Sequence, residues 1–369
     1  MLVAGAVIVA AAIVSGVVVA ITKDDDHGRR PDLIVAESKN DVFGDATSGI
    51  MWSADGSTLY RLHDARIEIL SGSPLASTRE YPVPPDRRLT LWSPDRTRIA
   101  LWYRDGTATV IAAADGSTVS TITGGTELTV AAWSPGGDAI AYSTGEHLVV
   151  VADAATGATR LQIDPAANEA GDSIQAIQWV DDTRLAAITY HVTSVADATT
   201  GEIVWRTSSS PDEAMAVSPD GSAVAVSQSR SRNQEVYAIA DGAELGVVEL
   251  EVPHALAFSW SPDSKWLFAT ADDDRPKLWD ATAHATRDEY PEYGPYEFGG
   301  AWAPDAHRIA IVDRFDQRIL VTDVTGALDD DELSVREDVE LLGAAWSPAG
   351  DRLASLGDDG EVFVWDIAG

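Results

Sequence analysis

The feature that most constrains this chain is a short phrase, Trp-Ser-Pro-Asp-Gly or a variant of it, that occurs eight times. Successive copies begin roughly 40 residues apart, and a steady period of this length indicates a repeat architecture rather than several unrelated domains. The copies begin at Trp52, Trp92, Trp133, Trp179, Val217, Trp260, Trp302 and Trp346.

Each phrase reads as a tight hairpin between two strands. Proline presets the backbone angle of a turn, and Asp followed by Gly suits the next positions. Apolar runs flank the phrase, as at residues 128–132 and 139–142. A third apolar run ends in Asp, as at residues 149–153, and a fourth leads into the next repeat. Four short strands per period predict the blade of a β-propeller.

Several motifs resemble those of a known family. Lys277-Leu-Trp-Asp280 and Val364-Trp-Asp366 are similar to the dipeptide that ends repeats of the Trp-Asp family, and Gly357-Asp-Asp-Gly-Glu361 resembles its preceding turn. Over residues 31–369 the chain resembles a divergent, bacterial-type member of this family. The resemblance implies an all-β fold, an eight-bladed propeller with four-stranded antiparallel blades, with seven blades as the alternative. The family's Gly-His pair is missing, so its His-to-Asp network is not expected.

The repeated tryptophans are predicted to be structural. Seven of the twelve tryptophans occupy one repeat position, where a large ring can pack blade against blade. Asp280 and Asp366, which end their repeats, are assigned a structural role as turn formers. The tryptophans concerned are Trp52, Trp92, Trp133, Trp179, Trp260, Trp302 and Trp346.

Charge and composition exclude several classes of partner and site. The chain has 59 acidic and 26 basic residues and a formal charge of −33, which disfavours nucleic acid and anionic lipid headgroups as partners. A solubility role explains this surface better than attraction of a basic partner. There are no cysteines, so disulfides, thiol nucleophiles and Cys-ligated zinc are excluded.

The N-terminus predicts a membrane anchor. Residues 2–21 carry no charge, and as a helix they would span about 30 Å, the thickness of a bilayer core. We expect residues 1–22 to be a retained single-pass helix, residues 23–30 a polar linker and residues 31–369 the propeller. A cleaved signal peptide is the alternative. Ala12, Gly16 and Ala20 place small residues four apart, which predicts weak self-association of such helices.

The orientation of the anchor stays open. Lys23, Arg29 and Arg30 follow the apolar run, and the positive-inside rule then keeps the propeller in the cytoplasm. However, a chain that begins within its hydrophobic segment can also have lost a basic N-terminal extension, which would reverse the orientation given by this rule. We expect an extracytoplasmic propeller.

A short N-terminal strand is predicted to close the ring. The last repeat ends at its third strand, near Asp366, and an open ring would leave an exposed sheet edge. Residues 33–36 (Leu-Ile-Val-Ala) have strand character. We therefore expect them to form the fourth strand of the last blade.

No catalytic motif is present in the sequence. It lacks a nucleophile elbow, a metalloprotease His pair and a phosphate-binding glycine loop. The histidines are scattered, and Asp272-Asp-Asp274 and Asp329-Asp-Asp331 lack the alternating ligands of a calcium loop. We therefore expect no metal, no cofactor and no enzyme activity.

Loops on one propeller face form the candidate binding surface. One connector is unusually rich in aromatic residues, and its expected neighbours carry arginines; exposed aromatic and arginine side chains are typical interface anchors. Padding of the gap between blades is the alternative role for the tyrosines. The candidates are Tyr290, Tyr293, Tyr296, Phe298, Arg230, Arg232 and Arg275.

These observations predict a membrane-tethered interaction platform that binds a protein or peptide. One alternative is a quinoprotein-like dehydrogenase, because residues 197–205 (Asp-Ala-Thr-Thr-Gly-Glu-Ile-Val-Trp) resemble the docking repeat of eight-bladed pyrroloquinoline-quinone enzymes. Only this copy is complete. A small-ligand sensor is the other alternative.

Overall fold

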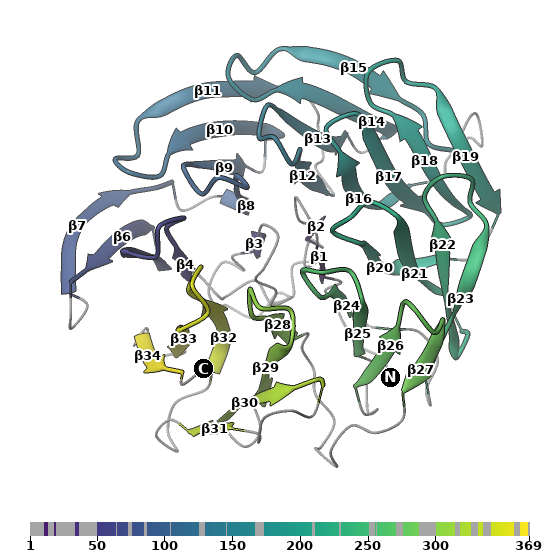
Figure 1. Ribbon diagram of the computed structural model, residues 1–369. Coiled ribbons are helices and arrows are strands. Elements are labelled where there is room, and N and C mark those ends of the chain that lie inside the picture. The colour runs from purple at the N-terminus through teal and green to yellow at the C-terminus, as the bar shows by residue number, and fades with distance from the viewer. Residues whose placement is uncertain are drawn as a thin grey trace, which may run out of the picture.

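The chain forms a ring of eight β-sheets around a central opening (Figure 1). The computed structural model describes residues 11–13, 18–19, 34–36 and 50–367. Apart from the three N-terminal segments, each sheet comes from one stretch of chain, and consecutive sheets are neighbours. Within 50–367, the residues not described are 64, 73–75, 85–86, 104, 125–129, 145, 167–172, 209–210, 229, 251–254, 256, 271–275, 288–299, 314–317, 326–330, 335–340 and 358–361.

The first four blades each have four antiparallel strands, ordered from the central opening to the rim. Blade 1 consists of β4 (Ile50–Trp52), β5 (Thr58–His63), β6 (Arg66–Ser71) and β7 (Ala76–Pro82). Blade 2 consists of β8 (Arg87–Trp92), β9 (Arg98–Tyr103), β10 (Thr107–Ala112) and β11 (Thr118–Thr123). Blade 3 consists of β12 (Ala131–Trp133), β13 (Ala139–Thr144), β14 (Glu146–Asp153) and β15 (Thr159–Ile163). Blade 4 consists of β16 (Ile174–Asp181), β17 (Arg184–Thr189), β18 (Val192–Asp197) and β19 (Ile203–Ser208).

The remaining blades repeat this plan, except that the eighth has three described strands. Blade 5 consists of β20 (Pro211–Val217), β21 (Ala223–Gln228), β22 (Asn233–Ala238) and β23 (Glu244–Glu249). Blade 6 consists of β24 (Ala257–Trp260), β25 (Trp266–Thr270), β26 (Lys277–Asp280) and β27 (Ala285–Arg287). Blade 7 consists of β28 (Gly300–Trp302), β29 (Arg308–Asp313), β30 (Arg318–Asp323) and β31 (Asp331–Ser334), and blade 8 of β32 (Leu341–Trp346), β33 (Arg352–Gly357) and β34 (Val362–Asp366). The predicted eight-bladed, all-β propeller is confirmed.

One prediction for the N-terminus is wrong, and another is not shown. Residues 33–36 were expected to complete blade 8, but β3 (Ile34–Ala36) pairs in parallel with β8 of blade 2. A β-branched run predicts a strand without specifying which sheet edge it joins, and β8 offers Leu89–Leu91 backbone for pairing.

The predicted membrane helix is also not seen. Its residues 11–13 and 18–19 are the strands β1 (Ala11–Ile13) and β2 (Val18–Val19), and β1 joins blade 6 through β24. The rest of residues 2–21 lies outside the described part of the chain. No helix in that described part is long and apolar enough to cross a bilayer.

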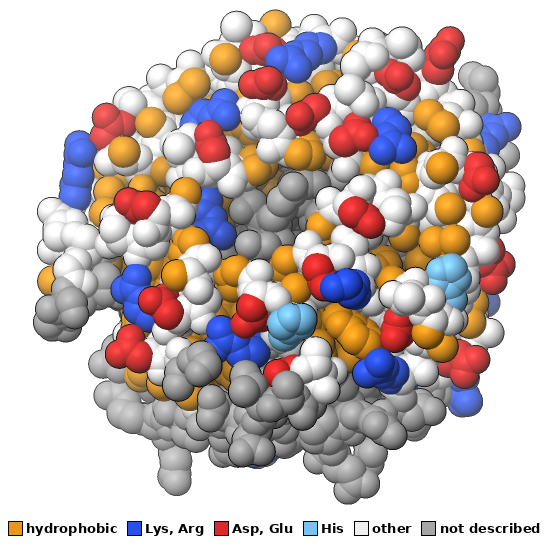
Figure 2. Space-filling view, in the orientation of Figure 1, with side chains coloured by type: hydrophobic (Ala, Val, Ile, Leu, Met, Phe, Trp, Pro, Cys, Tyr) orange, Lys and Arg blue, Asp and Glu red, His pale blue; other side chains and the backbone are white. Residues whose placement is uncertain are grey.

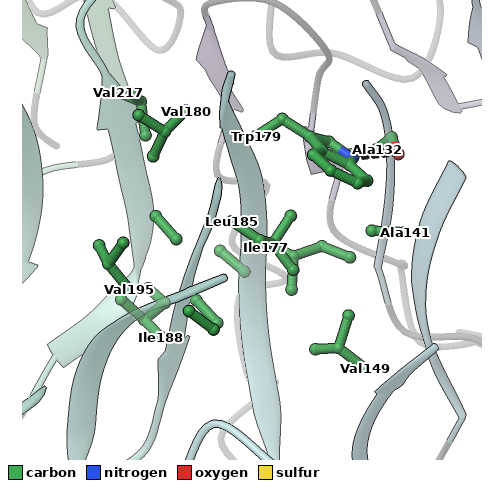
Figure 3. Packing of buried hydrophobic residues seen from close by; sticks show 14 of the residues in the cluster. Ala132, Ala141, Val149, Ile177, Trp179, Val180, Leu185, Ile188, Val195 and Val217 are labelled. Atoms are coloured by element: carbon green, nitrogen blue, oxygen red, sulfur yellow. Dashed lines mark hydrogen bonds between the residues drawn. The ribbon is translucent and has the colours of Figure 1, made fainter. Parts of the chain in front are cut away.

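The core consists of layers between blades, because each sheet is covered on both faces by its neighbours. The second strand β21 is buried along its whole length, whereas the rim strand β11 alternates between exposed and buried residues. Between blades 3 and 4, Trp179 and Ile177 face Ala132 and Val149 (Figure 3). This packing accounts for fully apolar inner strands.

A tryptophan at the end of the inner strand bridges most blade interfaces. The indole nitrogen of Trp179 donates to the carbonyl of Ala132 in the preceding blade, at 3.1 Å (Figure 3). Buried indoles need such a partner, and this bond makes one ring both an apolar filler and a polar bridge. The same bond, at 3.0–3.2 Å, is made by Trp52, Trp133, Trp260, Trp302 and Trp346.

At two interfaces other groups make the hydrogen bond between blades. Between blades 1 and 2, Arg96 donates to the carbonyl of Trp52 at 3.1 Å. Between blades 4 and 5, Val217 stands in place of tryptophan, and its amide donates to the buried Gln178 at 2.7 Å. Each of these two interfaces thus has a hydrogen bond to or from the inner strand of the preceding blade.

The same two interfaces carry an extra aromatic contact nearer the rim. Tyr81 of β7 donates its hydroxyl to Ala113 of blade 2 at 2.7 Å, and Trp205 of β19 donates to Ile239 of blade 5 at 2.7 Å. Both side chains are buried. The Trp205 ring lies over Gly242, where an added Cβ would meet it at 2.8 Å. Both interfaces thus have an aromatic hydrogen bond near the rim.

Side chains hold the first and last blades together. Trp52 donates to Ala345, while Arg352 donates to the Gly56 carbonyl at 2.5 Å and lies 4.3 Å from the centroid of the Trp52 ring. Arg98 and Arg308 make the equivalent contacts at two other interfaces. The ring therefore closes through an interface of the ordinary kind.

Arg352→Ala is expected to destabilise the fold by about 1–2 kcal/mol, because it removes a cation–π contact and a charge-assisted hydrogen bond at the closing interface. Chemical denaturation of both proteins measures the change. Arg66→Ala is the control: its pair with Glu80 is exposed, and we expect a loss of about 0–0.5 kcal/mol. Equal effects would show that the interface arginine has no special role.

Aspartates at strand ends form the turns. The carboxylate of Asp153 accepts hydrogen bonds from the amides of Ala155 and Thr156 and from Arg160, and Asp280 accepts amides of its own turn. The Arg160 and Thr156 hydrogen bonds lower the pKa of Asp153 to about 2. Hydrogen bonds from Ser53 and Ser57 lower the pKa of Asp55 to about 2.

These carboxylates make the fold acid-sensitive. Their folded pKa lies below the unfolded value of 3.8, so their stabilising effect is present above about pH 4 and is lost as the pH falls toward 2. Urea denaturation between pH 2 and 6 should show stability falling in this window. Asp153→Asn should reduce the pH slope. An unchanged slope in Asp153→Asn would contradict the assignment.

Candidate functional site

The turns between the second and third strands of all blades lie on one face of the ring, because every blade has the same strand order. We call it the second-turn face. Blades 4 and 5, which pack together through Gln178 and Val217, place there the turns β17–β18 and β21–β22. These two turns carry the exposed side chains considered below.

The β21–β22 turn is held by a buried glutamine. Gln234 has 0% of its surface exposed. Its side chain accepts a hydrogen bond from the backbone amide of Gln228 at 2.7 Å and donates one to the carbonyl of Ser231 at 2.6 Å. The Ser231 amide donates to the Gln228 carbonyl at 3.2 Å, which closes the turn around Arg230. One side chain thus fixes both ends of the loop.

Two arginines project from this fixed loop. Arg230 has a left-handed φ of 61°, a conformation that costs a non-glycine residue about 1–2 kcal/mol. The carbonyl of Arg232 accepts the amide of Leu250 at 2.9 Å, which ties its backbone to the end of β23. Both side chains are exposed, and neither has an acidic partner among the described residues.

The neighbouring β17–β18 turn presents a tyrosine. The turn residues are Tyr190 and His191, and the Thr189 hydroxyl accepts the amides of His191 at 3.4 Å and Val192 at 3.1 Å. Tyr190 is 54% exposed, the most exposed large hydrophobic side chain in the described part of the chain. A rigid two-residue hairpin therefore holds an aromatic ring in solvent, beside the blade that bears the two arginines.

The other predicted binding residues cannot be placed. Tyr290, Tyr293, Tyr296, Phe298 and Arg275 lie outside the described residues. Of the predicted set, the structure brings together Arg230 and Arg232 in one turn.

Sequence reasoning missed Tyr190 as a candidate. It lies between two strand-like runs, with no glycine, proline or aspartate to mark a turn. The Thr-x-x-Val spacing around it is the only local cue.

The predicted structural residues lie in the core or at strand ends. The seven tryptophans of the repeat position are each at most 3% exposed. Asp280 and Asp366 end the third strands β26 and β34. In residues 197–205, Asp197 forms a turn and Trp205 docks on blade 5, which is a packing role.

Comparison with known proteins agrees with this architecture. The model of the family described as "WD domain, G-beta repeat" (WD40) matches residues 251–280 and 337–366, which end at the two terminal Trp-Asp dipeptides. The crystal structure of the C-terminal WD40 domain of Sif2 aligns with a TM-score of 0.65 at 14% identity, covering 90% of this chain and 98% of that one. The fold is that of a WD40 propeller. No curated protein sequence matches the chain.

In the described part of the ring most basic side chains are paired, although acidic residues outnumber basic ones 59 to 26. On the face shown in Figure 2, basic side chains lie close to acidic ones, and neither sign forms a continuous patch. Ion pairs such as Lys265–Asp263 and Arg184–Asp181 account for this pattern. A basic side chain without a partner among the described residues is therefore unusual.

Proposed function

We propose that this protein is an interaction platform, without catalytic activity, that binds a protein or peptide on its second-turn face. The observation that supports it most is that Tyr190 is exposed on the β17–β18 turn, while Arg230 and Arg232 project from the corresponding turn of the next blade with no acidic partner among the described residues. Tyrosine and arginine are the residue types that dominate binding energy at protein interfaces. WD40 propellers generally bind protein partners, which agrees with this proposal.

Site-specific photocrosslinking tests this proposal. A photoreactive amino acid at position 190 should give a discrete adduct in native cells. The matched control is position 119, because Val119 is a 41% exposed side chain on the rim strand β11. Equal adducts at both positions, or none at position 190, would overturn the assignment of this face.

We also propose that residues 2–21 tether the ring to a membrane, with the propeller outside the cytoplasm and weak association of anchors through Ala12, Gly16 and Ala20. The uncharged length of this segment supports the tether. Insertion would require release of the β1 and β2 pairing.

Alkaline extraction of membranes tests the tether on the full chain. The wild type should stay in the membrane, and Ala10→Arg/Val14→Arg should be released, because each charge at mid-bilayer costs about 2.5–3.5 kcal/mol. Protease digestion of intact spheroplasts should cleave the propeller. Complete release of the wild type would refute the tether, and protection of the propeller would refute the orientation.

A further inference from the structure

The two arginines of the β21–β22 turn differ from every other basic residue with a described side chain. The others bind carboxylates, as Arg160 binds Asp153, or backbone carbonyls, as Arg206 binds Ala166 at 2.8 Å, or have further interactions, as do Lys277 and Arg318. In a chain with 59 acidic residues, these two arginines have no acidic partner among the residues that the structure describes, which leaves strong donors available. We propose that Arg230 and Arg232 bind a carboxylate-bearing segment of a protein partner. This inference rests on the proposed platform function.

The loop is pre-organised for such a ligand. Gln234 ties the two ends of the turn together, and Leu250 holds the backbone of Arg232. Because this backbone is already ordered, binding costs mainly the side-chain entropy of two arginines. Glycine at position 230 would relieve the strain of the left-handed backbone, yet the position holds the long, positively charged side chain of arginine.

Guanidinium groups pair with carboxylates and phosphates through two parallel hydrogen bonds. Glu235 is the acidic residue nearest to the two arginines in sequence. Its carboxylate accepts a hydrogen bond from the side-chain amide of Gln228 at 2.8 Å, within the sheet. Within the described part of the chain no acid accepts from these guanidinium groups, so the turn offers donor pairs to a bound anion.

Net charge decides between the possible anions. A charge of −33 repels polyanions at long range, whereas a single carboxylate within about 4 Å of an arginine responds chiefly to that arginine. A phosphate carries about twice the charge of a carboxylate and experiences correspondingly more repulsion. The best fit is a short segment with one or two Asp or Glu residues in an otherwise uncharged or basic context.

Tyr190 adds a requirement for an apolar neighbour. Its ring is 54% exposed on the adjacent blade, and an aromatic ring in solvent gains most from covering apolar surface. We therefore expect the segment to carry an apolar or aromatic residue near its acid.

Peptide display on the full-length protein tests the proposal. Random 12-residue peptides are selected on the wild type, and the enriched peptides are synthesised and their affinity is measured by fluorescence anisotropy. The expected peptides contain Asp or Glu beside an apolar residue. Arg230→Gln/Arg232→Gln should weaken their binding by about 10- to 100-fold, and Asp→Asn or Glu→Gln in the peptide by a similar factor.

Controls separate recognition from general charge. Arg66→Gln, at an exposed arginine paired with Glu80, should leave the affinity unchanged. Arg230→Lys/Arg232→Lys keeps the charge without the paired donors and should give an intermediate loss. The two losses, in protein and peptide, should be non-additive in a double-mutant cycle.

Other outcomes would overturn the inference in distinguishable ways. The selected peptides could lack acidic residues and depend on Tyr190 but not on the arginines for binding. That result would refute the carboxylate site but not the proposed platform function. Equal binding of polyglutamate or DNA would indicate a general anion surface, and a strong preference for a phosphorylated version of the peptide would assign the arginines to phosphate. Absence of any enriched peptide, together with no adduct from position 190, would refute both proposals.

Discussion

Trp346→Ala is expected to lower the free energy of unfolding by about 3–5 kcal/mol, the range for removing a large side chain from a packed core. Trp346 is 1% exposed, its indole donates to Ala301 at 3.0 Å, and the Arg308 guanidinium lies 5.1 Å from its ring. The substitution therefore removes apolar contacts and leaves the Ala301 carbonyl without its donor. Urea denaturation followed by fluorescence of the remaining tryptophans measures the loss.

Trp365→Ala is the matched control for this prediction. Trp365 lies in the same blade, on the last strand β34, where it is only partly buried beside Phe363. Its loss should cost about 1–2 kcal/mol, in proportion to the smaller buried area. If both variants melt at the wild-type midpoint, the repeated tryptophans do not hold the blades together.

Gly157→Ala is expected to destabilise the protein by about 2–5 kcal/mol, through overpacking and a left-handed backbone. Gly157 has a φ of 75°, and a methyl group there would overlap the carbonyl oxygen of Thr121 in the preceding blade. Because the obstacle is backbone, it cannot rotate away, and blades 2 and 3 would have to separate locally. Thermal and urea denaturation of the purified variant measure the effect.

Gly201→Ala isolates the backbone contribution. Gly201 occupies the same position of the next Asp-to-Gly turn, with a φ of 82°, but the nearest atom to an added methyl is Leu161 Cδ1 at 3.5 Å. Only the cost of the left-handed conformation, about 1–2 kcal/mol, should remain. Equal losses in the two variants would show that the close approach to Thr121 has no energetic consequence.

Much of the ring could be predicted because the repeat is local. The Trp-Ser-Pro-Asp phrase specifies a hairpin, its period specifies a blade, and eight copies specify the number of blades. Each of these inferences depends on residues close together in the chain, where turn chemistry and alternation act directly.

Contacts between distant residues were not predictable in this way. The pairing of Ile34–Ala36 with β8 depends on which free edge the strand meets, and alternation does not encode that choice. The hydrogen bonds of Arg96, Gln178, Tyr81 and Trp205 at two blade interfaces involve partners separated by more than 30 residues.

The candidate site was predictable only in part. Arg230 and Arg232 were visible as cations in a turn. The fixed loop that bears them depends on Gln234 and Leu250, whose roles emerge from the folded geometry. Tyr190 was missed because nothing in its immediate neighbours distinguishes a solvent-facing ring from a buried one.

Arg352 and Trp52 join blades 1 and 8 through the same kind of contact that Arg98 and Arg308 make elsewhere, so the closing boundary resembles other boundaries of the ring. A circularly permuted chain could therefore start at any blade and run once around the ring. It would keep all strands of the ring in their original order. New ends could then be moved away from the second turns of blades 4 and 5, or toward them, to attach a dye or a fusion partner at a chosen angle around the disc.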